Sequence, residues 1–227
     1  MTRIRKLSEA DHTLVTDAVA RAEEGTDGEI VTIVTERSDL YRDVALHYAM
    51  AAMLLLVAIV ALSPAAIESK LAWWSDGWTG EPDLRSLFFA LLIGEALIFL
   101  AVRYALAWTP LRLALTPKAT RSRRVRRLAV QYFKVGAERR TEARVGILLY
   151  LSLDERIAEI VADEAIHKVV PPERWGEAMA ALIDRVRVGE PGQGMAAAVA
   201  AIGTIIAEHF PKTETDRNEL PDRLIEL

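Results

Sequence analysis

Two long apolar runs, Val44–Ile67 and Leu87–Trp108, constrain this sequence more than any other feature. At about 1.5 Å per residue, a helix of either length would cross a hydrocarbon core of about 30 Å. Neither run has the polar stripe of a surface helix. We therefore predict a transmembrane helical hairpin, and the alternative is a buried helical pair in a soluble protein. The charged stretch before the first run indicates a retained span rather than a secretory signal.

Basic residues are distributed unevenly around the two runs. The loop between them, 68–86, has two Lys or Arg, whereas Arg112–Arg127 has seven and no Asp or Glu. Because positive residues favour the cytoplasmic side of a span, we expect both termini and the soluble part on the cytoplasmic side of a bacterial inner membrane. The loop would be external, with Trp73, Trp74 and Trp78 as an aromatic belt or, alternatively, a ligand site.

The basic run beside the second span predicts contact with anionic lipid headgroups, at about 1 kcal/mol per charge near the surface. Nucleic acid is the rival partner, but the net charge of -4 and the juxtamembrane position favour lipid and no nucleic acid. The predicted headgroup contacts are Arg121, Arg123, Arg124, Arg126 and Arg127.

Helical and strand periodicities occur on both sides of the hairpin. Leu7–Glu24 has helical spacing with Ser8 as its N-cap, and Glu29–Glu36 is a β-rich run. Val145–Ser152 is almost continuously apolar, as in a central strand covered on both faces, and Arg156–Ala162 returns as a second strand. Further helices are predicted over Arg123–Val135, about 172–187 and Met195–His209.

This order predicts an α/β sandwich with a mixed sheet, in which the first strand pairs with strands from beyond the hairpin. The hairpin returns the chain to the same side of the membrane, so one domain can close across it. The predicted parts are a first piece of the domain at 1–43, a hairpin at 44–109 with spans 44–67 and 87–108, the remainder of the domain at 110–210 and a C-terminal tail at 211–227.

Two stretches carry a family pattern: LSEADHTLVTDAVARAEEGTDGEIVTIVT and VRRLAVQYFKVGAERRTEARVGILLYLSLDERIAEIVADEAIHKVVPPERW. In the second, a helix ends in an aromatic residue, a short basic link follows, and an apolar hairpin comes next. Over roughly residues 7–36 and 122–210, the chain resembles the TPM domain of bacterial membrane proteins and thylakoid-lumen proteins. It is most similar to the inner-membrane branch in which a helical hairpin splits the domain. The resemblance implies a TPM-like mixed-sheet α/β sandwich.

The same resemblance implies a phosphatase or a factor that assembles or repairs membrane complexes, since members are reported in both roles. This chain departs from the acidic, metal-associated positions of the family. Ala143–Gly146 stands where members often have Asp-Asn-Gly, and Asp163–Ala165 replaces their Gly-Tyr-Gly. Each departure removes a carboxylate or a flexible backbone from the expected ion or phosphate site, which disfavours the phosphatase.

The densest ligand-like cluster is Asp163, Glu164 and His167. In a helix, Asp163 and His167 would share a face, where a carboxylate and an imidazole could bind a metal or relay a proton. Two ligands are fewer than zinc requires. We therefore favour the interpretation that these three residues belong to a polar loop beyond the end of a strand. We predict no cofactor, and a divalent metal only under the phosphatase alternative.

Glu29, Arg139 and Arg140 could meet at one edge of the assembled sheet. They could hold an anion or contact a partner there, and we favour a salt bridge.

Glu95 lies in the middle of the second span, where an ionised carboxylate costs several kcal/mol unless it is paired or protonated. Ala90 and Gly94 form a small-xxx-small pattern beside it that would permit close helix approach. We expect Glu95 either to be neutral or to meet a polar group of another subunit or membrane protein. A local hydrogen bond is the alternative.

The function predicted from these features is a non-enzymatic inner-membrane protein whose cytoplasmic TPM-like domain serves in interaction or in membrane-complex assembly and maintenance. The alternative is a TPM-type acid phosphatase or another metal-dependent hydrolase with Asp163, Glu164 and His167 near its site. The absence of cysteine excludes thiolate chemistry. A transporter is disfavoured because two spans per chain form no pore without oligomerisation.

Overall fold

The computed structural model describes residues 6–63, 84–136, 145–213 and 222–227. The chain forms two compact units, which we describe separately. One unit joins Met1–Asp39 to Lys118–Leu227, and the other is Leu40–Pro117.

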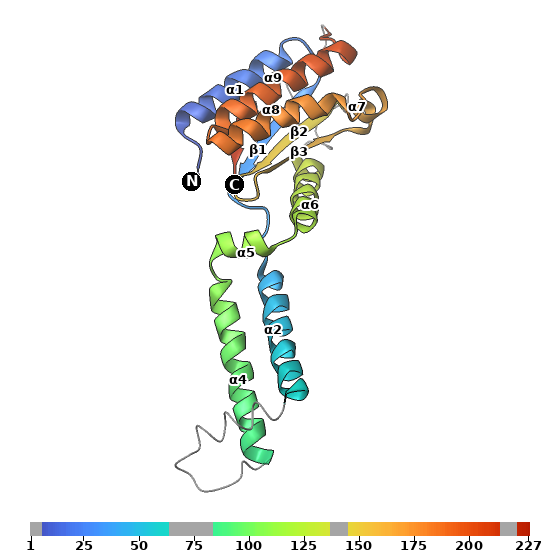
Figure 1. The fold of residues 1–227 in the computed structure, drawn as a ribbon. Helices are drawn as coiled ribbons and strands as arrows, with labels where there is room; N and C mark the ends of the chain where they lie inside the picture. The colour runs from blue at the N-terminus through green and yellow to red at the C-terminus, as the bar shows by residue number, and fades with distance from the viewer. Residues whose placement is uncertain (1–5, 64–83, 137–144, 214–221) are drawn as a thin grey trace. The chain divides into compact units, whose positions relative to one another are not determined.

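The first unit is built on a four-stranded mixed sheet with the strand order β3-β2-β1-β4 (Figure 1). Strands β1 (Glu29–Thr35) and β2 (Gly146–Ser152) pair in parallel along their whole length, although the hairpin separates them in the sequence. Strand β3 (Ile157–Ala162) runs antiparallel to β2, and β4 (Ile225–Glu226) runs parallel to β1. The predicted mixed α/β sheet is therefore confirmed.

Helices cover both faces of this sheet, which explains the unbroken apolar runs of β1 and β2. On one face lie α1 (Glu9–Glu23) and α9 (Pro191–His209), with α8 (Arg174–Val188) packed against α9. On the other face lies α6 (Lys118–Gly136). Every residue of β1 and β2 is buried as a result.

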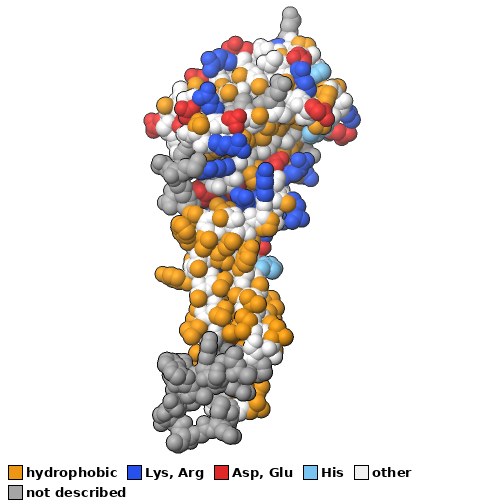
Figure 2. Space-filling view, viewed as in Figure 1, with side chains coloured by type: hydrophobic (Ala, Val, Ile, Leu, Met, Phe, Trp, Pro, Cys, Tyr) orange, Lys and Arg blue, Asp and Glu red, His pale blue; other side chains and the backbone are white. Residues whose placement is uncertain are grey.

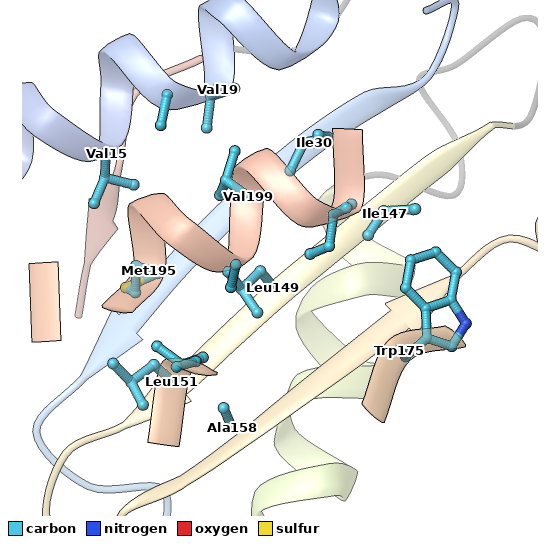
Figure 3. Packing of buried hydrophobic residues seen from close by; sticks show 14 of the residues in the cluster. Val15, Val19, Ile30, Ile147, Leu149, Leu151, Ala158, Trp175, Met195 and Val199 are labelled. Atoms are coloured by element: carbon cyan, nitrogen blue, oxygen red, sulfur yellow. The ribbon is translucent and has the colours of Figure 1, made fainter. Parts of the chain in front are cut away.

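Alternate residues of the strands face two separate cores, as the pleat requires. The larger core joins Val15 and Val19 of α1 to Met195 and Val199 of α9 over the strand residue Leu149 (Figure 3). The smaller core lies against α6 and contains Val31, Ile33, Val125, Ala129, Phe133, Leu148 and Tyr150. The two cores fix the register, because a slip of one residue would exchange their side chains.

Local signals in the sequence set several helix ends. Ser8 caps α1: its Oγ accepts the Asp11 N–H at 3.1 Å, and the Asp11 carboxylate accepts the Ser8 N–H at 3.0 Å. The predicted cap is thus confirmed. Gly189, with φ of 93°, ends α8 in the left-handed conformation that glycine adopts without strain. The short helix α7 (Glu164–Val169) follows β3 directly.

Part of the predicted C-terminal tail, 211–227, is built into the sheet. Ile225 and Glu226 form β4 and pair with Ile33 and Val34 of β1, and Leu224 is buried in the larger core. A two-residue strand has no periodicity of its own, so its pairing depends wholly on the sheet that receives it.

The second unit contains the two apolar helices α2 (Arg42–Leu62) and α4 (Leu84–Ala105), which pack on each other, and the short helix α5 (Thr109–Leu115). Both α2 and α4 are long and apolar enough to cross a membrane. Within α4 no residue is buried, and in α2 only Val44, Ala45 and Ala49 are. Apolar side chains dominate the outer surface of the pair (Figure 2), unlike the covered surface of a core helix in a soluble protein.

Candidate functional site

Three buried carboxyl groups lie where β1 and β2 begin and β3 ends. We call this group the acidic edge: Glu23, Glu29 and Asp163, with exposed fractions of 8%, 6% and 7%. Glu23 is the last residue of α1, Glu29 is the first residue of β1, and Asp163 directly follows β3. Buried carboxyl groups are uncommon without partners, so their partners indicate what each group does.

Asp163 ties the end of β3 to the start of β2. Its Oδ2 accepts the Gly146 N–H at 2.8 Å, and its own N–H donates to the Gly146 carbonyl at 3.0 Å. It is also the N-cap residue of α7, and its carbonyl accepts the His167 N–H at 3.1 Å. These bonds give Asp163 a structural role: its carboxylate holds the start of β2, and its backbone carbonyl accepts a hydrogen bond from α7.

The other two residues of the predicted cluster point elsewhere. Glu164 is exposed and pairs with Lys168 at 2.9 Å, and His167 is also exposed. The structure therefore places one of these three candidates in the interior and two on the surface. Among the described residues, no group of three or more His, Cys, Asp and Glu side chains could hold a metal ion. This donor set does not fit a divalent metal.

Glu29 lies at the same edge as Asp163. In the sheet register it pairs with Gly146, the residue that Asp163 contacts from the opposite strand. The register therefore places Glu29 beside the start of β2, at the edge where Asp163 lies. Arg139 and Arg140, its predicted partners, lie outside the described residues, so that salt bridge stays a prediction.

Glu23 has the most unusual environment of the three. The pKa of its carboxyl group is raised to about 8: burial is the largest cause, the nearby charges of Glu29 and Asp222 act in the same direction, and the Ile30 N–H and Lys212 oppose them. The Ile30 N–H donates to Glu23 Oε1 at 2.7 Å. At neutral pH this carboxyl group is mostly protonated, so it can share the edge with Glu29 without a full charge repulsion.

A second set of polar residues, three buried and one half-buried, lies at the opposite ends of β1 and β2. We call it the polar network: Ser38, Tyr150, Ser152 and Glu155. The Ser38 N–H donates to Glu155 Oε1 at 3.0 Å, its hydroxyl group lies 3.0 Å from the Tyr150 hydroxyl group, and the Ser152 hydroxyl group donates to Glu155 Oε2. Burial raises the pKa of Tyr150 to about 12, so Tyr150 stays a neutral hydrogen-bonding group.

Two ion pairs flank the polar network. Arg37 Nε contacts Asp154 at 2.9 Å, and Arg124 contacts Asp39 at 3.0 Å. Residues 36–39, which lead out of β1, are thereby fastened to the β2–β3 turn and to α6. Sequence reasoning missed this network because its members are far apart in the chain. The Ser-x-x-Glu spacing of Ser152 and Glu155, typical of side chains that cap backbone groups, was the one local signal.

The predicted headgroup contacts all lie on α6, but they do not all share its exposed side. Arg123, Arg126 and Arg127 are exposed, whereas Arg121 and Arg124 are half-buried. Arg126 lies 3.6 Å from Glu159. Burial raises the pKa of the Glu159 carboxyl group despite this neighbour. Three of the five arginines thus present a positive surface to solvent.

Glu95 is half-buried in α4, and one oxygen of its carboxyl group lacks a hydrogen-bond partner in the described part of the chain. Its Oε1 is buried and has no hydrogen-bond partner among the described residues. A Cβ on the neighbouring Gly94 would lie 3.2 Å from Leu56 Cδ2 of α2. The small residue therefore permits close packing inside the hairpin rather than leaving that contact for another chain.

The geometry defines an α/β sandwich whose sequence is interrupted by an apolar helical pair. Residues 111–205 match the family model of the TPM domain, and the chain therefore contains a TPM domain. The same fold occurs in the NMR structure of the BA42 protein from the psychrophilic bacterium Bizionia argentinensis, with a TM-score of 0.56, 17% identity and complete coverage of both chains. No curated protein matches the chain.

Proposed function

We propose that this protein is an integral inner-membrane protein of a bacterium and that its cytoplasmic TPM domain serves in interaction or in the assembly and maintenance of a membrane complex. The observation that carries the proposal is the exposed apolar surface of α2 and α4, which lie in the sequence between β1 and β2 of one sheet. Water would penalise that surface heavily, whereas lipid would not.

The state of the acidic edge supports a non-enzymatic role. The Asp163 carboxylate accepts a backbone N–H, and Glu23 is mostly neutral near pH 7. Glu164 and His167 lie on the surface without a third ligand for a metal among the described residues. A metal-dependent hydrolase would need converging donors with open coordination positions.

The exposed arginines of α6 support a cytoplasmic orientation and contact with anionic headgroups. Arg123, Arg126 and Arg127 follow the second apolar helix closely in the sequence. Three positive charges near an anionic leaflet would contribute about 3 kcal/mol. The hairpin is also proposed to contact a membrane-protein partner or a second copy through the region of Glu95.

Two measurements on the full chain test this function. Alkaline carbonate should leave the protein in the membrane pellet, because a spanning hairpin resists extraction that removes peripheral proteins. The purified protein should not hydrolyse p-nitrophenyl phosphate with Mg²⁺, Ca²⁺, Mn²⁺ or Zn²⁺. Release into the carbonate supernatant would contradict the membrane assignment. Metal-dependent hydrolysis that Asp163→Asn abolishes would favour the phosphatase instead.

A further inference from the structure

The short helix α5 lies across one end of the apolar helix pair, where α2 begins and α4 ends (Figure 1). Contacts within the same compact unit hold it there. The Arg112 guanidinium group donates from Nη1 to the Leu106 carbonyl at 3.1 Å, and the Tyr48 hydroxyl group of α2 donates to the Leu115 carbonyl at 3.0 Å. A small buried cluster adds a third contact: Tyr41, Val44 and Leu113. Helix α5 is therefore a fixed part of the hairpin.

The turn from α4 into α5 satisfies its backbone groups internally. The N–H groups of residues 106–108 each donate to a carbonyl group of α4, at 2.9, 3.0 and 3.3 Å. The Leu106 carbonyl accepts from Arg112, and the Arg112 carbonyl accepts from the Thr116 hydroxyl group at 2.8 Å. Backbone groups at a helix end need such partners where water is scarce. The turn can therefore enter the edge of a bilayer without leaving these groups unpaired.

The outer surface of this turn and of α5 is uncharged. Residues 104–117 contain one charged residue, Arg112, which is buried. The largest exposed side chains of the stretch are apolar or aromatic, with exposed fractions of 85% for Tyr104, 65% for Trp108 and 40% for Leu115. Charged residues resume at once with Lys118. The chain therefore passes from an apolar surface to a basic helix at the end of α5.

Charged residues of the helix pair occur at the same end. Arg42, Asp43 and His47 lie in the first two turns of α2, and residues 48–62 carry no charge. Arg103 lies in the last turn of α4. Helix α5 is therefore at the level where the surface of the pair changes from apolar to charged. Trp and Tyr are enriched at that level of a bilayer, because each has an apolar ring and a polar end.

We propose that α5, with Tyr104 and Trp108, lies at the boundary between the headgroups and the acyl chains of the bilayer and sets the depth of the hairpin. The partner of this surface is lipid, because the surface is uncharged and continues the exposed apolar surface of α2 and α4. This inference rests on the proposed membrane function, since it names the segment that meets the interface.

Spin labels at single introduced cysteines test this depth, because the sequence lacks cysteine. The full chain is placed in nanodiscs of phosphatidylcholine and phosphatidylglycerol, and Leu115→Cys reports on α5. Leu54→Cys, at a position of α2 that is 65% exposed, is the control for the acyl interior. Val188→Cys, at a position of the TPM domain that is 71% exposed, is the control for water. Collisions with oxygen and with a water-soluble nickel chelate measure the depth of each label.

We expect the ratio of oxygen to nickel collisions at Leu115 to lie between those of the two controls. Tyr104→Ala/Trp108→Ala should raise nickel collisions at Leu115 by about twofold or more, because the aromatic anchors are lost. The matched change Leu97→Ala/Leu100→Ala removes two exposed apolar side chains from the middle of α4. It should leave the Leu115 label at its original depth.

A Leu115 label that meets the nickel chelate as often as the Val188 label would overturn the proposal. A label shielded from both reagents would also overturn it and would indicate a protein occupant, such as a second copy. An unchanged depth after Tyr104→Ala/Trp108→Ala would contradict the role in setting depth. The Leu54 label separates these results from failure of the proposed function: exposure of Leu54 to nickel would contradict membrane insertion itself.

Discussion

At the scale of single residues, Glu23 makes the stability of the domain depend on pH. Its pKa is raised from an ordinary 4.5 to about 8. Below pH 4.5 the group is neutral in both the folded and the unfolded states. Between pH 4.5 and about 8 the unfolded chain ionises first, so stability falls as pH rises, and above about 8 the loss is complete. At about 1.4 kcal/mol per pKa unit, the loss is on the order of a few kcal/mol.

Glu23→Gln should remove this dependence, because an amide oxygen still accepts the Ile30 N–H and never ionises. We expect the variant to be more stable than the wild type at pH 8.5 and similar at pH 5, measured by thermal unfolding in detergent. Glu24→Gln, at an exposed neighbouring position, is the matched control and should leave the pH profile unchanged. A wild-type profile that is flat from pH 5 to 8.5 would contradict the environment described for Glu23.

Asp163 gives a second prediction at this scale. Asp163→Ala removes the acceptor of the buried Gly146 N–H, and it should destabilise the domain by about 1–3 kcal/mol. His167→Ala, at an exposed position, should change stability by about 0.5 kcal/mol or less. Denaturant unfolding measures both. Equal effects of the two changes would show that Asp163 lacks the structural role assigned to it.

At the scale of elements, the apolar patterning of the sequence predicted the central strands. It did not predict the strand and the side-chain contacts that depend on tertiary structure. The apolar run Val145–Ser152 predicted a doubly covered strand because burial on both faces leaves no polar alternation. Strand β4 could not be predicted, since two residues carry no period. The Asp163–His167 spacing implied a shared helix face, but Asp163 is the cap of α7, and its side chain bonds to Gly146 instead.

The helix pair yields a prediction about Glu95. Glu95 is half-buried in α4, and in lipid a carboxyl group is costly unless a polar contact, here one from another chain, satisfies it. Glu95→Leu should therefore reduce the oligomer trapped by chemical crosslinking in native membranes. Glu95→Gln, which keeps the polar group without the charge, should retain most of it. Assembly that is unchanged by Glu95→Leu would refute a role for this residue in contacts between chains.

At the scale of the whole molecule, the hairpin is an insertion within one sheet rather than an addition to one end. Strands β1 and β2 are neighbours in the sheet and lie on either side of α2 and α4 in the sequence. Sequence patterning could predict this, because strand signals occur on both sides of the apolar runs. The polar network could not be predicted, because Ser38 meets Tyr150 and Glu155 only after the sheet has assembled.

The most direct test of the central claim is cysteine accessibility in intact cells, since the sequence contains no cysteine of its own. Two sites are compared. Ser75 lies between the two apolar runs in the sequence, and Val188 is exposed on the TPM domain, and each is changed to cysteine in a separate variant. We predict that a membrane-impermeant maleimide labels Ser75→Cys in intact spheroplasts and labels Val188→Cys only after lysis. Labelling of Val188→Cys before lysis, or equal protection of both positions, would contradict a spanning hairpin with a cytoplasmic domain.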